Sequence, residues 1–306
     1  MRRRTFLGAT GLVAASPRAL AAAARELSDP RSPMKARDLN AYLRARIAVE
    51  EPSVDRITFG DPETVVRRIG TAWMPYWKTC RAAVAAGVNV LVVHEPAFYT
   101  HWDLDEKDGR DFYSAPEAGR KAFEKARDEK RAWLEANGLV LIRCHDVLDR
   151  LPEIGIPHAF GRLLGLEAKG LLRSKRFYDV FAVEPAPAVA VASRLAERLR
   201  AVGQPGVAFY GDSERVVRSI GVGTGCICDP LESMELAPDL FVGIDDTIRT
   251  WIQTTWAEDT GRPLVVVNHG ASEEAGMRAL SEHLRGAFPD KRVVHFPQGC
   301  GYRWIS

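Results

Sequence analysis

The sequence has few cysteines, little net charge and no long apolar run. Its five cysteines are an odd number without regular spacing, which excludes a small domain built on disulfides. The formal net charge is +2, and basic residues are interspersed with acidic ones, so nothing indicates a nucleic-acid-binding surface. No apolar run reaches the roughly 18 to 20 residues that span a bilayer, which argues against stable membrane insertion. With 306 residues, 46% of them apolar, the chain can bury one full core or two small ones.

The first 24 residues have the three parts of an export signal. A basic start at residues 2–4 precedes a mildly apolar stretch, residues 7–15, and an alanine-rich segment, residues 19–24. The RRTFL core at residues 3–7 resembles a twin-arginine signal, which exports folded proteins. We therefore expect residues 1–24 to be a signal peptide and the mature protein to be periplasmic or extracellular. The alternative is a disordered basic tail on a cytoplasmic protein.

Two eleven-residue segments of the chain repeat each other. Residues 60–70 read GDPETVVRRIG and residues 211–221 read GDSERVVRSIG, with eight identical positions. Each copy is followed by a strand-like apolar run that ends in polar residues. Counted from the repeated isoleucines, His94 and Asp245 fall at the same place. This pattern predicts two related halves.

A second pattern occurs once in each half, where a strand-like run leads to a histidine with a carboxylate four residues later. The first case is His145 with Asp149, and the second is His269 with Glu273. Ligands of open α/β sheets collect beyond the carboxyl ends of strands. Imidazole and carboxylate are the ligands that suit zinc, iron, manganese or cobalt. Since Ser272 is a good helix N-cap, we expect Glu273 in the first turn of a helix.

Strand-like and helix-like segments alternate through the chain. We therefore predict an α/β fold with two pseudo-repeated halves, residues 36–170 and 176–306, in which mixed sheets are flanked by helices and a metal cleft lies between the halves. The expected helices lie near residues 77–86, 117–137, 189–202, 247–258 and 272–287. The expected strands lie near residues 66–72, 88–93, 139–144, 178–183, 207, 217, 264–267 and 293–296.

These motifs together resemble a known family. The residues that carry the resemblance are His94-Glu95-Pro96, His145-x-x-x-Asp149 and Asn268-His269-x-x-x-Glu273. They resemble the dinuclear-metal family named after NGG-interacting factor three, also called GTP cyclohydrolase I type 2. The similarity extends from about residue 34 to residue 296. It implies paired α/β halves, a ring-shaped homo-hexamer, and two divalent metal ions per subunit in the cleft between the halves.

Carried over by motif, the resemblance implies five metal ligands, namely His94, Glu95, Asp149, His269 and Glu273. Glu95 stands where the family has the second histidine of a His-His pair, and Asn268 stands where glycine is usual. An anionic oxygen in place of a neutral nitrogen should shift the preference toward harder ions.

Two further histidines are candidate catalytic residues. We expect His145 to hydrogen-bond to a ligand or to bound water, with direct ligation as the alternative. His101 and Asp103 follow the first ligand pair closely enough to line the mouth of a cleft. His145 and His101 could therefore carry protons. Asp245 could orient a ligand, although a helix N-cap would explain it equally well.

Two other motifs indicate little about function. The glycine-rich residues 221–225 match neither a Walker loop nor a complete dinucleotide fingerprint. Cys226-Ile227-Cys228 has no Cys or His partner pair nearby, and buried cysteines explain it better than a metal half-site.

The reaction we expect is metal-dependent hydrolysis of a small molecule whose identity the sequence leaves open. A metal-bridged hydroxide would attack a purine ring, a phosphoester or an amide. An exported enzyme would rarely meet cytoplasmic GTP, so the signal and the cyclohydrolase name are in conflict. The alternative is a metal-binding oligomeric scaffold or metal carrier without catalysis, whose coordination could be closed.

Overall fold

The computed structural model describes residues 33–103 and 116–305, apart from residues 153, 167–169, 176, 224, 226 and 227, together with Ala22 and Ala24. The predicted signal peptide, except for those two alanines, lies outside the described residues, as do Cys226 and Ile227. No helix among the described residues is long and apolar enough to cross a membrane.

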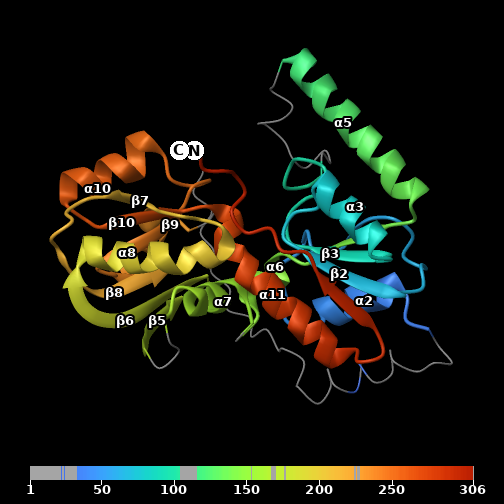
Figure 1. Ribbon diagram of the computed structural model, residues 1–306, viewed down its shortest axis with the longest axis horizontal. Helices are drawn as coiled ribbons and strands as arrows, with labels where there is room; N and C mark the ends of the chain where they lie inside the picture. The colour runs from blue at the N-terminus through green and yellow to red at the C-terminus, as the bar shows by residue number, and fades with distance from the viewer. Residues whose placement is uncertain are drawn as a thin grey trace.

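Two mixed β-sheets lie side by side and are flanked by helices (Figure 1), which confirms the predicted fold class. The first sheet has five strands, and only β1 runs antiparallel to its neighbour. In spatial order its strands are β1 (Ile57–Phe59), β4 (Val140–Arg143), β3 (Val90–Val93), β2 (Arg68–Ala72) and β11 (Arg292–His295).

The second sheet has six strands, of which β8, β9 and β10 are parallel to one another. Antiparallel strands complete it on both sides. In spatial order the strands are β5 (Leu171–Lys175), β6 (Tyr178–Pro187), β8 (Val216–Val222), β9 (Leu240–Ile244), β10 (Leu264–Val267) and β7 (Ala208–Tyr210).

Four strands of each sheet have the same order and the same relative directions. The order β1-β4-β3-β2 in the first sheet corresponds to β7-β10-β9-β8 in the second, with the first strand of each series antiparallel to the second. Beyond these four, β2 pairs with a parallel strand and β8 with an antiparallel one. The sequence repeat covers the turn into β2 and the turn into β8. An internal duplication stays a prediction with which this order agrees.

Helices cover both faces of the first sheet because its central strands are apolar on both sides. Val90 and Val92 of β3 pack in one cluster with α2 (Ala36–Arg44), while Leu91 and Val93 pack in another with α3 (Trp77–Ala85). Alternate residues of a strand point to opposite faces, so the apolar run over residues 90–93 supports two layers. The long helix α5 (Glu117–Ala136) joins the α3 side through Leu134 and projects beyond the sheet (Figure 1).

Shorter helices and α8 complete the second half. Helix α6 (Asp146–Arg150) packs in the core of the first sheet, and α7 (Ile156–Leu163) packs in the cores of both sheets. Helix α8 (Ala188–Leu199) with its 3-10 extension η3 (Arg200–Val202) covers the second sheet. The remaining elements are α9 (Pro230–Ser233), η5 (Met234–Leu236), the π-helical turn η6 (Thr250–Thr254), α10 (Thr255–Thr260) and α11 (His269–Ala287). The single helix expected over residues 247–258 is thus a π-helical turn followed by α10.

Helix α11 connects the two sheets. Its residue Ala271 packs in the core of the second sheet, whereas Met277, Leu280 and Leu284 pack in the core of the first. Strand β11 then pairs with β2 in the first sheet. The predicted division at residues 170–176 stays a prediction, but the last strand of the range assigned to the second half pairs with the first sheet.

The start of α11 differs from the expectation. The helix begins at His269, and the side chain of Asn268 caps it by accepting a hydrogen bond from the Ala271 N–H. Ser272 lies inside the first turn, where its hydroxyl donates to the His269 carbonyl at 2.7 Å. The prediction of Ser272 as N-cap was wrong because asparagine is as good an N-cap and stands directly after the strand. His269 and Glu273 therefore lie one helical turn apart on the same face.

Candidate metal centre

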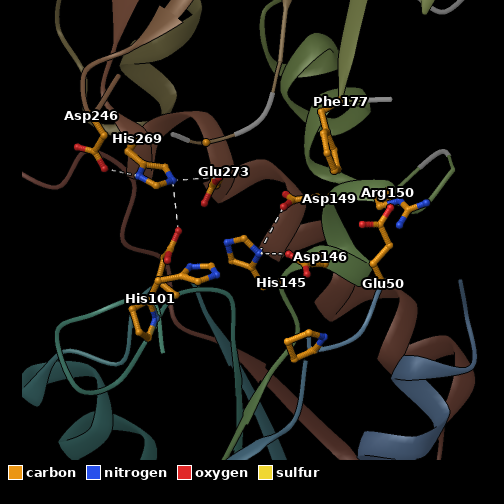
Figure 2. A pocket seen from close by; sticks show the side chains of 14 residues that line it. Glu50, His101, His145, Asp146, Asp149, Arg150, Phe177, Asp246, His269 and Glu273 are labelled. Carbon is orange, nitrogen blue, oxygen red and sulfur yellow. Dashed lines mark hydrogen bonds and ion pairs between the residues drawn. The ribbon is translucent and has the colours of Figure 1, made fainter. Parts of the chain in front are cut away.

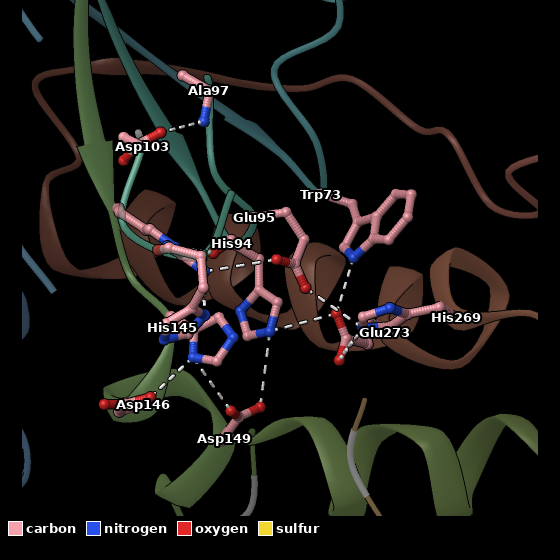
Figure 3. A network of polar contacts seen from close by, with 12 residues as sticks. Trp73, His94, Glu95, Ala97, Asp103, His145, Asp146, Asp149, His269 and Glu273 are labelled. Atoms are coloured by element: carbon pink, nitrogen blue, oxygen red, sulfur yellow. Dashed lines mark hydrogen bonds and ion pairs between the residues drawn. The ribbon is translucent and has the colours of Figure 1, made fainter. Parts of the chain in front are cut away.

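The candidate metal centre lies where three histidines that follow the carboxyl ends of β3, β4 and β10 come together, namely His94, His145 and His269 (Figure 3). His94 follows β3 directly, whereas His145 and His269 each stand two residues after the last residue of their strand. Because β10 belongs to the second sheet, the site combines side chains of both sheets.

His94 is fully buried and presents one free nitrogen to two carboxylates. Its Nδ1 lies 3.1 Å from the carbonyl oxygen of Cys144, which can only accept a hydrogen bond. Nδ1 therefore carries a proton, and in the neutral ring the lone pair is on Nε2. This Nε2 lies 3.2 Å from Oε2 of Glu273 and 3.6 Å from Oδ1 of Asp149.

His269 is arranged in the same way. Its Nδ1 lies 2.7 Å from Oδ2 of Asp246, which leaves Nε2 as the free nitrogen. This Nε2 lies 3.2 Å from Oε1 of Glu95 and 3.1 Å from Oε1 of Glu273. Glu273 thus places one carboxylate oxygen beside each histidine, and the indole N–H of Trp73 donates to its Oε2 at 2.7 Å.

Both histidine Nε2 atoms are buried polar atoms without a hydrogen-bond partner among the described residues. Such atoms are costly unless another group satisfies them. Donor atoms bound tetrahedrally at about 2.0 to 2.2 Å from a zinc ion lie roughly 3.3 to 3.6 Å apart, which is close to the separations seen here. The residues present therefore fit divalent metal ions.

Two sets of side chains have ligand atoms within 4.8 Å of one another. One set is His94, His145 and Asp149, and the other is His94, Glu95 and Glu273. All five predicted ligands are buried, with at most 8% of each residue exposed. The structure thus brings together the residues that the motifs predicted, and their role as ligands stays a proposal.

A cavity of about 450 Å³ opens beside this cluster (Figure 2). Its lining includes four of the proposed ligands, Glu95, Asp149, His269 and Glu273, together with Phe177, Arg150 and Glu50. Both predicted catalytic histidines, His145 and His101, also reach the cavity. A small molecule could enter and contact the proposed ligands.

Comparison with known proteins places the chain in a family. The profile of Duf34/NIF3 (NGG1p interacting factor 3) matches residues 118–298, which is more than half of the chain. The chain belongs to the Duf34/NIF3 family. No curated protein matches this NIF3-family chain.

Solved structures share the fold of this NIF3-family protein. A hypothetical protein of Staphylococcus aureus is 17% identical, with a TM-score of 0.70, and the match covers 90% of this chain and 100% of that one. A Bacillus cereus protein related to NIF3 is 11% identical, with a TM-score of 0.64 and coverages of 94% and 98%. Reduced HcgD from Methanocaldococcus jannaschii is 18% identical, with a TM-score of 0.62 and coverages of 86% and 97%. At these identities the likeness establishes the fold alone.

The charges in the centre of this NIF3-family protein favour a cation. Burial alone would lower the pKa of His94, but the negative charges of Glu273 and Asp149 outweigh it and raise that pKa to about 10. Burial alone would raise the pKa of Glu273, yet His269 and His94 hold it well below its usual range. Three carboxylates around two imidazoles therefore favour positive charge, either as protons on the histidines or as divalent ions in their place.

His145 is held by acidic groups and stacks on a proposed ligand. Its backbone N–H donates to Oδ1 of the buried Asp55 at 2.6 Å, and its Nδ1 lies 2.8 Å from Oδ1 of Asp146. Its ring stacks on His94 with centroids 4.4 Å apart. These contacts suit the predicted supporting role, while the grouping of His145 with His94 and Asp149 leaves ligation open.

Two other residues singled out in the sequence have local structural roles. Asp103 is not among the described residues that line the cavity, and it accepts hydrogen bonds from the backbone N–H groups of Ala97 and Phe98. Asp245 accepts hydrogen bonds from the His269 N–H at 3.0 Å and the Asn268 side chain at 2.9 Å, and so it orients the start of α11.

Several residues of the site were missed by the sequence analysis. Trp73 and Asp246 hydrogen-bond to Glu273 and His269, and the buried Arg143 lies behind Glu95. Asp246 stands next to Asp245 at a predicted strand end, so its position was a usable signal. Arg143 is itself a charged residue within the apolar run of β4, and this was its usable signal. Trp73 had none.

The glycine-rich segment borders the centre. Gly225 has a φ of +42°, and a Cβ atom there would lie 2.5 Å from Oε1 of Glu273 and 3.0 Å from Nε2 of His269. Only glycine allows this close approach without displacing the two side chains. The glycine therefore serves the proposed metal centre.

Proposed function

We propose that this NIF3-family protein binds two divalent metal ions and uses them to hydrolyse a small molecule. The observation that carries the proposal concerns the buried Nε2 atoms of His94 and His269, which have no hydrogen-bond partner among the described residues and lie on either side of one carboxylate, that of Glu273. A carboxylate with one oxygen beside each of two free imidazole nitrogens is suited to bridge two ions.

The distances suggest which residues would hold each ion. His94, Asp149 and Glu273 would hold the first, because two carboxylate oxygens lie within 3.6 Å of the His94 Nε2. His269, Glu95 and Glu273 would hold the second, because two carboxylate oxygens lie within 3.2 Å of the His269 Nε2. The ligand set is compatible with zinc, iron, manganese or cobalt, and Glu95 favours the harder of these.

Three protein ligands per ion support catalysis over a purely structural role. Structural zinc sites are closed by four protein ligands, whereas catalytic sites keep a position for water or substrate. Paired divalent ions lower the pKa of water and polarise substrate oxygens when they are bound. The cavity beside the cluster supplies room for a substrate, and His145 and His101 reach it as groups that could hold protons.

The charged residues around the cavity indicate which net charge the substrate carries. Apart from the proposed ligands, the acidic residues Glu50, Asp146 and Asp246 line it, with Arg150 as the single lysine or arginine among its described lining residues. A triphosphate would meet this acidic rim unfavourably. We therefore infer an ester, amide or phosphoester substrate of low negative charge in preference to GTP.

The first test is elemental analysis of the protein purified without chelator, beside His269→Ala and Glu95→Ala. We expect about two transition-metal ions per chain in the wild type and fewer in both variants, together with metal-dependent hydrolysis of a model ester or phosphoester. Absence of metal after reconstitution would rule out the proposal. Metal without any turnover would favour the scaffold or metal carrier.

Assembly and location are separate proposals. We propose a homo-hexamer that is exported through the twin-arginine-like signal. Side chains such as Trp251, which is 91% exposed, and Ile305, which is 92% exposed, support an assembly that covers apolar surface. Light scattering and cell fractionation test these two proposals, and a cytoplasmic monomer would contradict both.

A further inference from the structure

His101 lies at the mouth of the cavity and is held by a single buried side chain. Arg143, at the end of β4, is only 1% exposed. One of its terminal nitrogens, Nη1, donates to the His101 backbone carbonyl, and the other, Nη2, lies 3.5 Å from Nδ1 of the His101 ring. The same guanidinium therefore contacts His101 through both its backbone and its side chain.

The remaining contacts of Arg143 fix its orientation. Its Nε donates to the His94 carbonyl at 2.9 Å, and its Nη2 also lies 3.5 Å from Oε2 of Glu95. A guanidinium held by two carbonyls and a carboxylate cannot rotate away without breaking these contacts. Its N–H groups stay directed toward the loop that contains His101.

This contact decides which nitrogen of His101 carries the proton. An arginine side chain has donors only and keeps its proton in proteins. An N–H on Nδ1 of His101 would point at another N–H across 3.5 Å, whereas a lone pair there is attracted to it. We propose that Arg143 fixes His101 as a neutral imidazole protonated on Nε2, and that this N–H donates a hydrogen bond to a substrate oxygen in the cavity.

The loop around His101 is built to hold one conformation. Tyr99 and Asp103 both have positive φ angles, +80° and +60°, which are unusual for residues other than glycine. Asp103 accepts two backbone hydrogen bonds from within the loop, and the buried Lys130 donates to the Ala97 carbonyl at 2.8 Å. Unfavourable backbone angles persist where surrounding contacts over-determine them, often at functional sites.

The surroundings of the His101 ring agree with a neutral state. Partial burial and the positive charge of Arg143 lower the pKa of His101 below its usual range, and they outweigh the opposing negative charges of Asp146 and Glu95. The ring packs edge-on against His145, with centroids 5.5 Å apart. A neutral donor at this place would bind a carbonyl or phosphoryl oxygen, and proton transfer would be left to His145. The role toward substrate rests on the proposed function, whereas the proton position does not.

The proton position can be measured without metal or substrate. Nitrogen-15 NMR of histidine-labelled, full-length protein distinguishes protonated from unprotonated ring nitrogens, and the His101 signals are those that disappear in His101→Gln. We expect Nε2 to be protonated and Nδ1 to be unprotonated at neutral pH. The opposite tautomer, or a doubly protonated ring, would overturn the proposal.

A pair of variants tests whether Arg143 is the cause. In Arg143→Gln we expect a mixture of the two tautomers at His101. Arg150→Gln, which removes a guanidinium from the same cavity, should leave the His101 signals unchanged. If Arg143→Gln does not fold, the wild-type spectrum and the Arg150→Gln control still decide the tautomer. An unchanged tautomer in folded Arg143→Gln would refute the positioning role.

Inorganic phosphate serves as the probe for the donor role. Its affinity for the metal-loaded protein should fall about 2- to 10-fold in His101→Leu, the loss typical of one hydrogen bond, and should largely return in His101→Gln, whose amide can donate. Equal affinity in wild type and His101→Leu, including none in either, would overturn the donor role. Failure of the proposed function would appear separately, as absence of bound metal with the tautomer unchanged.

Discussion

The carboxyl edges of the two sheets are built alike but contribute differently to the metal centre. Strands β3 and β4 end level in register, as do β9 and β10. The residue after β3 is His94 and the residue after β9 is Asp245, so the two occupy matching positions. His145 and His269 match in the same way. Of the two residues that directly follow β3 and β9, His94 is a proposed ligand and Asp245 is not.

The difference follows from how each histidine turn is held. The backbone N–H of His269 donates to Asp245, whereas that of His145 donates to Asp55, which comes from the loop before β1. Because Asp55 holds the first turn from outside, the position after β3 is free for a ligand. In the second sheet the matching position, after β9, is occupied by Asp245, which holds the His269 turn. Each histidine turn needs one carboxylate to accept its backbone N–H. Where that carboxylate follows the neighbouring strand, as Asp245 does, the strand end is not available for a metal ligand.

The largest effect should come from the carboxylate that both sheets share. Glu273→Ala removes an oxygen from each proposed ion, so metal content should fall from about two ions per chain to near zero. Asp149→Ala should remove about one ion, because Asp149 lies within 3.6 Å of the Nε2 atom of His94 and is proposed as a ligand of that ion alone. Elemental analysis measures both. Equal losses in the two variants would disprove the bridging position of Glu273.

Gly225→Ala should weaken binding of the proposed ion at His269 nearly as strongly. The new methyl group would lie 2.5 Å from the Glu273 carboxylate, so metal content should fall by at least one ion. Gly203→Ala is the matched control, since Gly203 also has a positive φ but open space around it. Both variants should lose about 1 to 2 kcal/mol of folding stability from backbone strain. Metal loss in Gly203→Ala as well would attribute the effect to strain alone.

A smaller effect should separate the partners of the two matching histidines. Asp246→Asn weakens the group that orients His269, and it should reduce affinity at that position about 10- to 100-fold. Asp146→Asn acts on His145, which we take to be a supporting residue, and should change metal affinity less. Competition titrations with a chelating dye measure both. A larger effect of Asp146→Asn would make His145 a ligand.

The smallest effect concerns a histidine on α11 that lies outside the metal centre. Burial and Arg46 lower the pKa of His283 to about 4. The neutral form is therefore favoured in the folded state, and its stabilisation is present above the unfolded pKa of about 6.5 and is lost as pH falls toward 4. Because the ring is partly exposed, we expect a loss of about 1 to 2 kcal/mol over this range.

Denaturant melts of wild type and His283→Gln between pH 7 and pH 4 measure this loss. The variant should show a shallower pH dependence, and bound metal should not change the difference between the two proteins. Identical pH profiles would show that His283 is not responsible.

Local sequence patterns were sufficient to predict most of the helices and strands. The apolar runs at residues 88–93 and 264–267 became β3 and β10, and the charged segment at residues 117–137 became α5. The start of α11 was predicted wrongly because two good capping residues, Asn268 and Ser272, compete there. The two histidine turns followed from motif spacing, because a histidine after a strand and a carboxylate four residues later share one turn. The full set of five proposed ligands, which includes His94 and Glu95, followed from the resemblance to the family's motifs.

The sequence by itself determined the α/β alternation, the two histidine turns and their matching carboxylates, since each depends on residues within a few positions of one another. The tertiary structure decided which strand ends meet, that β11 joins the first sheet, and that Trp73 contacts Glu273 across 200 positions of sequence. It also decided the roles of Arg143 and Asp246. These depend on packing between distant segments, where the available partners are set by the whole fold and not by local spacing.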